Sequence, residues 1–289
     1  NATLAKLWPY DPKPRRLWTD RISEVCTPDF LRPAPDAGAD GPQPIFIVGM
    51  PRSGTTLLDR LLGAHPRVRS VGELDDFPAQ LRWMADSTDV YGETMRRRLP
   101  ELDYAELGRR YLAHTRWRAP DAAFYIDKRP LNQTFAGLIR RALPGARLLR
   151  MVRDDMAVCF SNFRTYLGET YAYSYSLDSL VEFAHEDTRL NAHWHAAMPG
   201  QMLDVPYAAL VTDTEATMRR VTAFCGLEWN PACLDTTANP ATVATPSAIR
   251  VRGKIDRGGL DEWRRYAAQL EGLRHGLASG SPKAQGALP

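Results

Sequence analysis

The chain has 289 residues and a formal net charge of +3, from 37 Lys and Arg against 34 Asp and Glu. Its 44% hydrophobic and 25% charged residues are typical of a globular protein and exclude a disordered, collagen-like or coiled-coil chain. The length is within the range of one large domain. The small net charge gives no support for a nucleic-acid partner, and we expect none.

Membrane insertion and disulfide formation are not indicated by the sequence. No stretch approaches the roughly 18 apolar residues of a membrane-spanning helix, and the N-terminus lacks a signal-peptide pattern. We therefore expect no membrane span and a cytoplasmic location. The cysteines form no CxxC pair and are expected to be reduced and buried: Cys26, Cys159, Cys225 and Cys233. The chain starts with Asn1 rather than Met, which leaves open whether a further segment or domain precedes it.

Composition divides the chain into three segments. Residues 1–42 are rich in proline and charge, which predicts a lead-in helix followed by an exposed loop. Residues 43–275 are expected to form the compact domain. Residues 276–289 contain Gly, Ser, Pro, Lys and Gln and predict a flexible tail.

The compact domain begins with strand and helix patterns in alternation. The apolar run Ile45 to Val48 is typical of a strand buried on both faces, and a glycine loop and a helix over residues 55–62 follow it. Further strands are predicted at 124–126, 148–152 and 202–205. Further helices are predicted at 131–143, 154–166, 179–197 and 214–225. This alternation predicts an α/β fold, a P-loop-like central parallel β-sheet flanked by helices.

The loop Gly49–Thr56 has the features of an anion-binding site. It follows a strand and precedes a helix, where unpaired backbone N–H groups and the helix dipole attract an anion. Its candidate ligand-binding residues are Arg52, Ser53, Gly54, Thr55 and Thr56. The loop resembles the pattern GxxxxGK[ST], but Thr55 replaces the lysine, which disfavours ordinary ATP or GTP hydrolysis. The alternative is a tight turn before an N-capped helix.

Two further groups follow the carboxyl ends of predicted strands. Lys128 comes directly after the strand at 124–126, and Arg153 comes directly after the strand at 148–152. Ser161 lies eight residues beyond Arg153, a little over two helical turns, so both side chains can lie near one face. The alternatives are a structural Lys128 and a surface Arg153 with a helix-facing serine. Arg129 is expected to face solvent.

Four blocks of this sequence, in the same order, resemble sulfotransferases that use 3′-phosphoadenosine 5′-phosphosulfate (PAPS). The resemblance is to the bacterial enzymes often fused to tetratricopeptide repeats and to the tyrosylprotein sulfotransferases. The blocks are Pro44–Glu73, Tyr125–Phe163, Met202–Leu234 and Ser247–Tyr266.

The resemblance implies a role for each matching residue. Arg153 and Ser161 would bind the 3′-phosphate, and Arg52 and Lys128 would place positive charge at the sulfuryl group. Glu73 would be the general base on the acceptor hydroxyl, which must lose its proton during transfer. PAPS is then the cofactor, 3′-phosphoadenosine 5′-phosphate (PAP) is the product, and no metal is expected.

The resemblance also implies nucleotide contacts later in the chain. Tyr207 matches a nucleotide-contacting tyrosine, with a core tyrosine as the alternative. A basic stretch matches the loop that folds over the nucleotide, with a solvated charge run as the alternative. Its members are Ser247, Arg250, Arg252 and Lys254.

The identity of the base is left open by the sequence. Glu73 could instead cap the helix that contains Leu74 and Phe77. His65 is a competing base, although it ends the loop helix on the side away from the phosphates, which favours a structural role. His193 and His195 are two residues apart in a predicted helix and point to different faces, so they are not expected to bind metal.

The predicted function is transfer of a sulfuryl group from PAPS to a hydroxyl on a small molecule, glycan or peptide. The first alternative is a P-loop-type small-molecule kinase, disfavoured by Thr55 and by the lack of an obvious Mg²⁺-binding acidic pair. The second alternative is a non-catalytic nucleotide-binding module. A tyrosine cluster in a predicted substrate-covering loop hints at an aromatic or amphipathic acceptor: Tyr166, Tyr171, Tyr173 and Tyr175.

Overall fold

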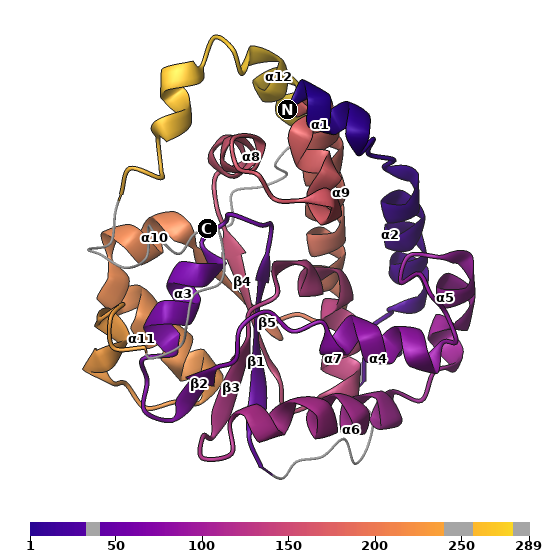
Figure 1. Cartoon of the computed structure of the whole chain (residues 1–289). Helices are drawn as coiled ribbons and strands as arrows, with labels where there is room; N and C mark the ends of the chain where they lie inside the picture. Colours follow the sequence, from indigo (N-terminus) through magenta and orange to yellow (C-terminus); the bar gives the residue numbers. More distant parts are fainter. Residues whose placement is uncertain (33–40, 240–256, 280–289) are drawn as a thin grey trace.

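A five-stranded parallel sheet forms the centre of the molecule (Figure 1). The computed structural model describes residues 1–32, 41–239 and 257–279. The strand order is β2-β3-β1-β4-β5, and every neighbouring pair is parallel. The strands are β1 (Gln43–Gly49), β2 (Val68–Ser70), β3 (Phe124–Asp127), β4 (Arg147–Val152) and β5 (Met202–Pro206). The predicted α/β fold with a central parallel sheet is confirmed.

Alternate residues of the central strand pack on opposite faces of the sheet. Phe46 and Val48 belong to one buried apolar cluster, and Ile45 and Ile47 belong to the other. All four side chains are fully buried, because β1 lies between β3 and β4 with helices on both sides. This burial explains the continuous apolar run in the sequence.

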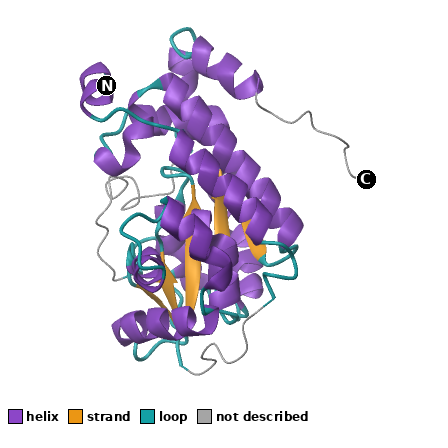
Figure 2. Ribbon diagram, turned by 90° about the vertical axis from the view of Figure 1, so that its right-hand side faces the viewer, coloured by secondary structure: helices purple, strands orange, loops and turns teal. Residues whose placement is uncertain are grey.

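Helices cover both faces of the sheet (Figures 1 and 2). The Phe46 face packs against α4 (Asp76–Met84), α6 (Tyr104–Thr115), α7 (Ala136–Ala142) and α9 (Leu177–Ala197). The Ile45 face packs against α3 (Thr55–Leu62), α10 (Tyr207–Thr212) and α11 (Thr214–Cys225). A third cluster joins α9 to α8 (Asp155–Phe163) and α12 (Glu271–Ser279) beyond the carboxyl ends of the strands. The remaining α-helices are α1 (Ala2–Leu7), α2 (Lys13–Val25) and α5 (Glu93–Arg98).

Short 3-10 helices connect several of these elements. Two of them border the site described below, η3 (Pro130–Phe135) and η4 (Glu169–Tyr175). The others are η1 (Leu99–Glu101), η2 (Arg116–Arg118), η5 (Pro231–Leu234) and η6 (Glu262–Tyr266). Across the described ranges, no helix is both long and apolar enough to span a bilayer.

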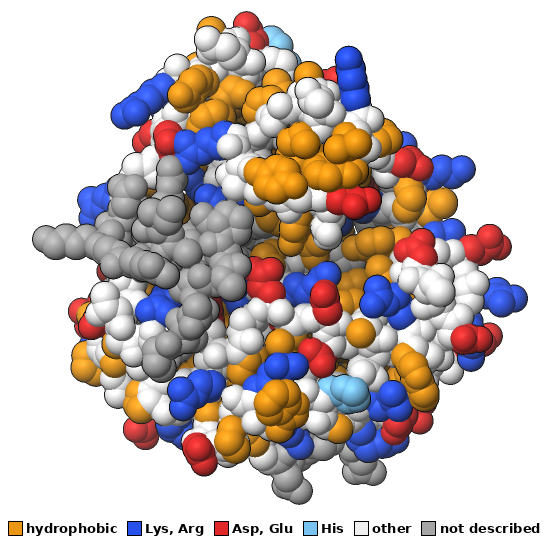
Figure 3. Space-filling view, viewed as in Figure 1, with side chains coloured by type: hydrophobic (Ala, Val, Ile, Leu, Met, Phe, Trp, Pro, Cys, Tyr) orange, Lys and Arg blue, Asp and Glu red, His pale blue; other side chains and the backbone are white. Residues whose placement is uncertain are grey.

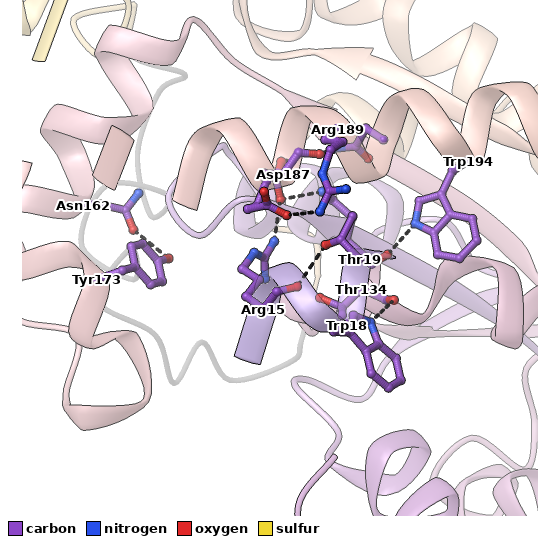
Figure 4. A network of polar contacts seen from close by, with 12 residues as sticks. Arg15, Trp18, Thr19, Thr134, Asn162, Tyr173, Asp187, Arg189 and Trp194 are labelled. Atoms are coloured by element: carbon purple, nitrogen blue, oxygen red, sulfur yellow. Dashed lines mark hydrogen bonds and ion pairs between the residues drawn. The ribbon is translucent and has the colours of Figure 1, made fainter. Parts of the chain in front are cut away.

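The N-terminal segment is part of the compact body. Trp18 and Ile22 of α2 are fully buried in the Phe46 cluster. The indole N–H of Trp18 donates to the Thr134 carbonyl at 3.4 Å, and that of Trp194 donates to the Gln133 carbonyl at 3.0 Å, so two tryptophans hold η3 (Figure 4). The compact body therefore does not begin at Gln43, as the proline-rich composition had suggested.

The C-terminal boundary also differs from the expectation. Gly276–Ser279, placed in the flexible tail by composition, form the last turn of α12. Leu273 of this helix is buried in the third cluster and packs with residues of α8 and α9. Apolar packing against α9 therefore holds in a helix residues that composition assigns to a flexible tail. Residues 280–289 lie outside the described residues.

Candidate active site

The glycine loop passes from β1 to α3 at the carboxyl edge of the sheet. Gly49 and Gly54 have φ angles of 138° and 113°, a region that favours glycine. A Cβ on Gly49 would lie 2.7 Å from the Met151 carbonyl oxygen, and one on Gly54 would lie 2.6 Å from Cδ2 of Tyr207. Both glycines are therefore required by close packing as well as by backbone conformation. The loop exposes the N-terminus of α3, which has no side-chain cap.

Hydroxyl groups of the loop are buried beneath this helix end. Ser53, Thr55 and Thr56 are each no more than 5% exposed. The Ser53 hydroxyl is buried and has no hydrogen-bond partner in the described part of the chain. An unsatisfied buried hydroxyl is costly, and a bound anion would satisfy it. The loop therefore has the features of an anion site that the sequence predicted.

Arg52 connects the loop to α8. Its backbone has a φ of 69°, which is uncommon for a residue with a side chain and is enriched at functional sites. Its Nε donates to the Ser161 hydroxyl at 3.3 Å. Its carbonyl accepts a hydrogen bond from Nη1 of Arg153 at 2.7 Å. Arg153 and Ser161, predicted to lie near one face, are thus brought together with Arg52 between them.

Arg153 also connects the loop to the C-terminal part of the chain. Its Nη2 donates to the Gly259 carbonyl. Its guanidinium lies 4.7 Å from the centroid of the Tyr207 ring. Tyr207 begins α10 and packs against Gly54, so it borders the predicted anion site.

The basic stretch assigned to the nucleotide lies outside the described residues. It comprises Ser247, Arg250, Arg252 and Lys254. The Arg153–Gly259 hydrogen bond shows that the chain after this stretch returns to the glycine loop.

Lys128 and Glu73 form an ion pair at the same edge of the sheet. Nζ of Lys128 donates to Oε1 of Glu73, and the lysine side chain is 3% exposed while that of Glu73 is 37% exposed. The backbone positions both groups, because Lys128 N–H donates to the Gly72 carbonyl at 2.8 Å. Asp127 pairs with Phe46 of β1, so Lys128 lies beside the strand that enters the glycine loop. The pair presents a fixed cation and a partly exposed carboxylate.

Asp127 fixes the backbone next to this ion pair, since it directly precedes Lys128 and is bonded to Leu74, the residue after Glu73, a role that the sequence analysis did not identify. Its carboxylate accepts hydrogen bonds from Leu74 N–H at 3.3 Å, Tyr111 hydroxyl at 3.0 Å and Asn132 Nδ2 at 3.2 Å. Burial raises the pKa of Asp127 to about 7. The signal in the sequence was an acidic residue at the end of an apolar strand, directly before Lys128.

The family model described as "Sulfotransferase family" matches residues 44–231, which is more than half of the chain. The chain belongs to the sulfotransferase family. The matched range includes the glycine loop, the Glu73–Lys128 pair, Arg153 and Ser161.

Related proteins agree with this family membership. An uncharacterized protein of Aquifex aeolicus is 29% identical over 95% of the chain and 37% of its own length. Protein-tyrosine sulfotransferase 1 of Danio rerio is 30% identical over 66% of the chain and 55% of its own length. The chain thus spans about a third to a half of these two relatives.

A solved structure shares the fold. The sulfotransferase domain of the Synechococcus PCC 7002 olefin synthase is similar with a TM-score of 0.53 and 20% identity, over 89% of this chain and 100% of that domain. At this identity the likeness concerns the fold. It confirms the expected sulfotransferase architecture.

His65 has a structural position in this member of the sulfotransferase family. The side chain is buried, its Nδ1 accepts the Arg67 N–H at 3.1 Å, and its Nε2 lies 3.0 Å from the Glu228 carbonyl. Both ring nitrogens are therefore occupied by backbone groups, with Nε2 carrying the proton. The helix-cap alternative for Glu73 is wrong, because Asp75 occupies the N-cap position of α4.

Two other expectations for this region need correction. Arg129, expected to face solvent, is 20% exposed and forms an ion pair with Asp75 at 2.8 Å. In the tyrosine cluster, Tyr173 and Tyr175 are buried and Tyr166 is 66% exposed. Tyr173 and Tyr175 are thus packed into the body of the molecule, where Tyr173 stacks on Phe183 of α9 with ring centroids 3.6 Å apart, whereas Tyr166 is exposed.

Metal ligands do not gather in the part of the chain that the structure describes. Within those ranges there is no group of three or more His, Cys, Asp or Glu side chains placed to hold an ion. His195 lies 3.2 Å from Asp204. Catalysis without a metal stays a prediction.

Proposed function

We propose that this chain transfers the sulfuryl group of PAPS to a hydroxyl acceptor without a metal ion. The observation that carries the proposal is the buried Lys128 ammonium held against the Glu73 carboxylate beside the glycine loop. One group can stabilise negative charge and the other can accept a proton. Sulfuryl transfer needs both functions.

The residues around the loop fit PAPS as the donor. The buried Ser53 hydroxyl, the close approach at Gly49 and Gly54, and the α3 N-terminus suit the phosphosulfate. Arg153 and Ser161 lie at the loop's other side, where they would bind a second phosphate, the 3′-phosphate. PAPS supplies an activated sulfuryl group when it is bound. The basic stretch at residues 247–254 remains a predicted nucleotide contact.

Lys128 and Glu73 would divide the chemical work. The Lys128 ammonium is fixed by burial and by its carboxylate partner, so it can stabilise charge on the transferring group without reorganising. Oε1 of Glu73 is engaged by Lys128, while Oε2 has no hydrogen bond within the described residues. Oε2 is therefore the atom that would accept the proton of the acceptor hydroxyl. Arg52 would add positive charge from within the loop.

The alternatives are less consistent with this site. A P-loop-type kinase would lack its lysine, because Thr55 occupies that position, and family membership points to sulfuryl rather than phosphoryl transfer. A non-catalytic module would not require an ion pair beside the anion loop. The acceptor would be a small molecule, glycan or peptide hydroxyl, and the names of the tyrosine-specific relatives favour a phenol. The cytoplasmic location also stays a prediction.

A transfer assay tests this function. The purified chain is incubated with PAPS or with ATP and Mg²⁺, together with a panel of phenols and aliphatic alcohols, and products are measured by mass. Sulfated products from PAPS in the presence of a chelator are expected. Phosphorylated products from ATP would support the kinase, and tight PAP binding without any product would support the non-catalytic module.

A further inference from the structure

A pocket of about 650 Å³ lies between α2, α4, η4 and α9. Its volume is within the range of small-molecule binding sites. It is separate from the glycine loop, since no loop residue lines it. The face in Figure 3 shows acidic and basic side chains close together in a central hollow, with hydrophobic side chains above them.

The pocket borders the Glu73–Lys128 pair. Asp75, two residues after Glu73, and Arg129, directly after Lys128, both line it and form an ion pair at 2.8 Å. Tyr171 is close enough to Glu73 for that carboxylate to help raise the tyrosine pKa, after the larger effect of burial. Glu73 and Lys128 do not themselves line the pocket, but the Asp75–Arg129 pair places one end of it next to them.

Aromatic side chains form much of the interior. Tyr91 and Phe135 stack with ring centroids 6.5 Å apart on one side, and Tyr173 and Phe183 stack at 3.6 Å on another. Such walls favour a flat, apolar body in the ligand. They do not by themselves specify its polar groups.

Arg82 adds a cation at a distance from the reacting pair. Asp75, Pro78 and Arg82 line the pocket at helical spacing, so one face of α4 forms its floor. The seven residues from Asp75 to Arg82 correspond to about 10 Å along the helix axis. Arg82 is half-buried, and its guanidinium has no hydrogen bond or ion pair with any residue the structure describes.

Two other polar atoms in the wall also lack partners. Arg15 is 9% exposed, and its Nη2 donates a hydrogen bond to Asp187 at 3.2 Å (Figure 4). Its Nε is buried and has no hydrogen-bond partner in the described ranges. The hydroxyl of Tyr10 is likewise buried and unbonded there, and burial raises its pKa to about 12, so it remains a neutral donor. The pocket therefore has unsatisfied donors.

The acidic residues of the lining do not neutralise Arg82. Asp75 is paired with Arg129. Asp11 and Asp89 are exposed, and each accepts a backbone N–H at 2.9 Å, from Lys13 and Tyr91 respectively. Water screens their charge more strongly than that of a half-buried guanidinium.

We propose that this pocket is the acceptor site and that its ligand is a hydroxyl compound with an aromatic body and an anionic group, bound by Arg82, at the end opposite the hydroxyl. The proposal rests on the sulfotransferase function above, because it places the hydroxyl at Glu73. A guanidinium favours a carboxylate, sulfate or phosphate, to which it donates two parallel hydrogen bonds.

Binding measurements test the acceptor class independently of turnover. The probes are 4-(4-hydroxyphenyl)butanoate and its amide, which differ only in the anionic end. Calorimetry with the chain saturated by PAP should show the carboxylate binding about tenfold to a hundredfold more tightly than the amide. Arg82→Gln should remove that preference while amide binding is retained.

Arg97→Gln is the matched control, since Arg97 is exposed on α5 and does not line the pocket. It should keep the preference. Equal binding of the two probes, no binding of either, or an unchanged preference in Arg82→Gln would each overturn the proposal. Absence of sulfated product with normal probe preference would reject the proposed chemistry instead, so the two failures are distinguishable.

Discussion

The Lys128–Glu73 pair allows stability and turnover to be separated by a double-mutant cycle. Glu73→Gln removes the proton acceptor and the countercharge of an ammonium that is only 3% exposed. Lys128→Met removes the ammonium and leaves Glu73, which is 37% exposed and can be hydrated. The two single variants should therefore differ in stability although both lose catalytic function.

The expected magnitudes follow from burial. Leaving a buried charge without its partner costs up to about 3–5 kcal/mol. For Glu73→Gln we expect about 1–3 kcal/mol, because the side chain at position 73 is partly exposed and the new amide oxygen can still accept a hydrogen bond from Lys128. Lys128→Met should cost less than about 1 kcal/mol. The double variant should regain most of the stability lost by Glu73→Gln, because no charge is left unpaired.

Turnover, unlike stability, should not recover in the double variant. Glu73→Gln should slow transfer to an aliphatic hydroxyl by about 10²–10⁴ through loss of the general base. Lys128→Met should slow it by about 10²–10³. The double variant should remain inactive while being more stable than Glu73→Gln.

Urea unfolding and a PAPS-dependent transfer assay measure the two quantities on the same samples. A phenolic acceptor should lose less rate in Glu73→Gln and recover in part at high pH, because a phenol ionises readily. Full turnover in Glu73→Gln, or a double variant less stable than Glu73→Gln, would refute this account of the pair.

Three other predictions concern the donor site, a buried carboxyl and the N-terminal helix. Arg153→Ala should weaken PAP binding by about tenfold to a hundredfold in calorimetry and AMP binding much less, and equal losses would contradict a 3′-phosphate contact. Burial raises the pKa of Asp127 from 3.8 to about 7, so the folded protein retains a proton on this carboxyl that the unfolded chain releases. The protonated carboxyl therefore stabilises the fold fully below pH ~4, and this stabilisation is lost as the pH rises to ~7. Asp127→Asn should remove this fall in urea unfolding between pH 4 and 7, and an unchanged slope would show that Asp127 does not cause it. Trp18→Ala should reduce the free energy of unfolding by about 3–5 kcal/mol, whereas a loss below about 1 kcal/mol would show that α2 is dispensable.

The central elements of the fold were predictable because local pattern and burial agree there. The run Ile45 to Val48 is apolar because β1 is buried on both faces, and the helix predicted at 214–225 matches α11. The three-residue strand β2 and the helix α10, which begins directly after β5, were not predicted. Neither is long enough to show a period in the sequence.

The N-terminal segment shows where composition misleads. Its prolines and charges are typical of an exposed loop, yet Trp18 and Ile22 are buried against η3 and the Phe46 cluster. Trp18 packs edge-on against Tyr91 and Phe135 and donates to the Thr134 carbonyl, groups that lie far from it in the chain. Long-range contacts of this kind leave no local signal.

The candidate site was predicted as a set of residues but not as a network. Strand ends indicated Lys128 and Arg153, and helical spacing indicated Ser161. The positive φ of Arg52 and its position between Arg153 and Ser161 depend on the folded loop. The partnership of Glu73 with Lys128 required the pairing of β2 with β3, which sequence spacing does not give.

The position of α2 has a consequence for how the substrate range of such a chain can change. The proposed donor site is formed by the glycine loop and later parts of the chain, whereas Tyr10 and Arg15 line the proposed acceptor pocket from the N-terminal segment. Substitutions near the N-terminus can therefore alter which hydroxyl compound is accepted without disturbing the groups that handle the nucleotide. Selection, or a directed-evolution library confined to residues 8–15, can explore new acceptors while the transfer machinery stays constant.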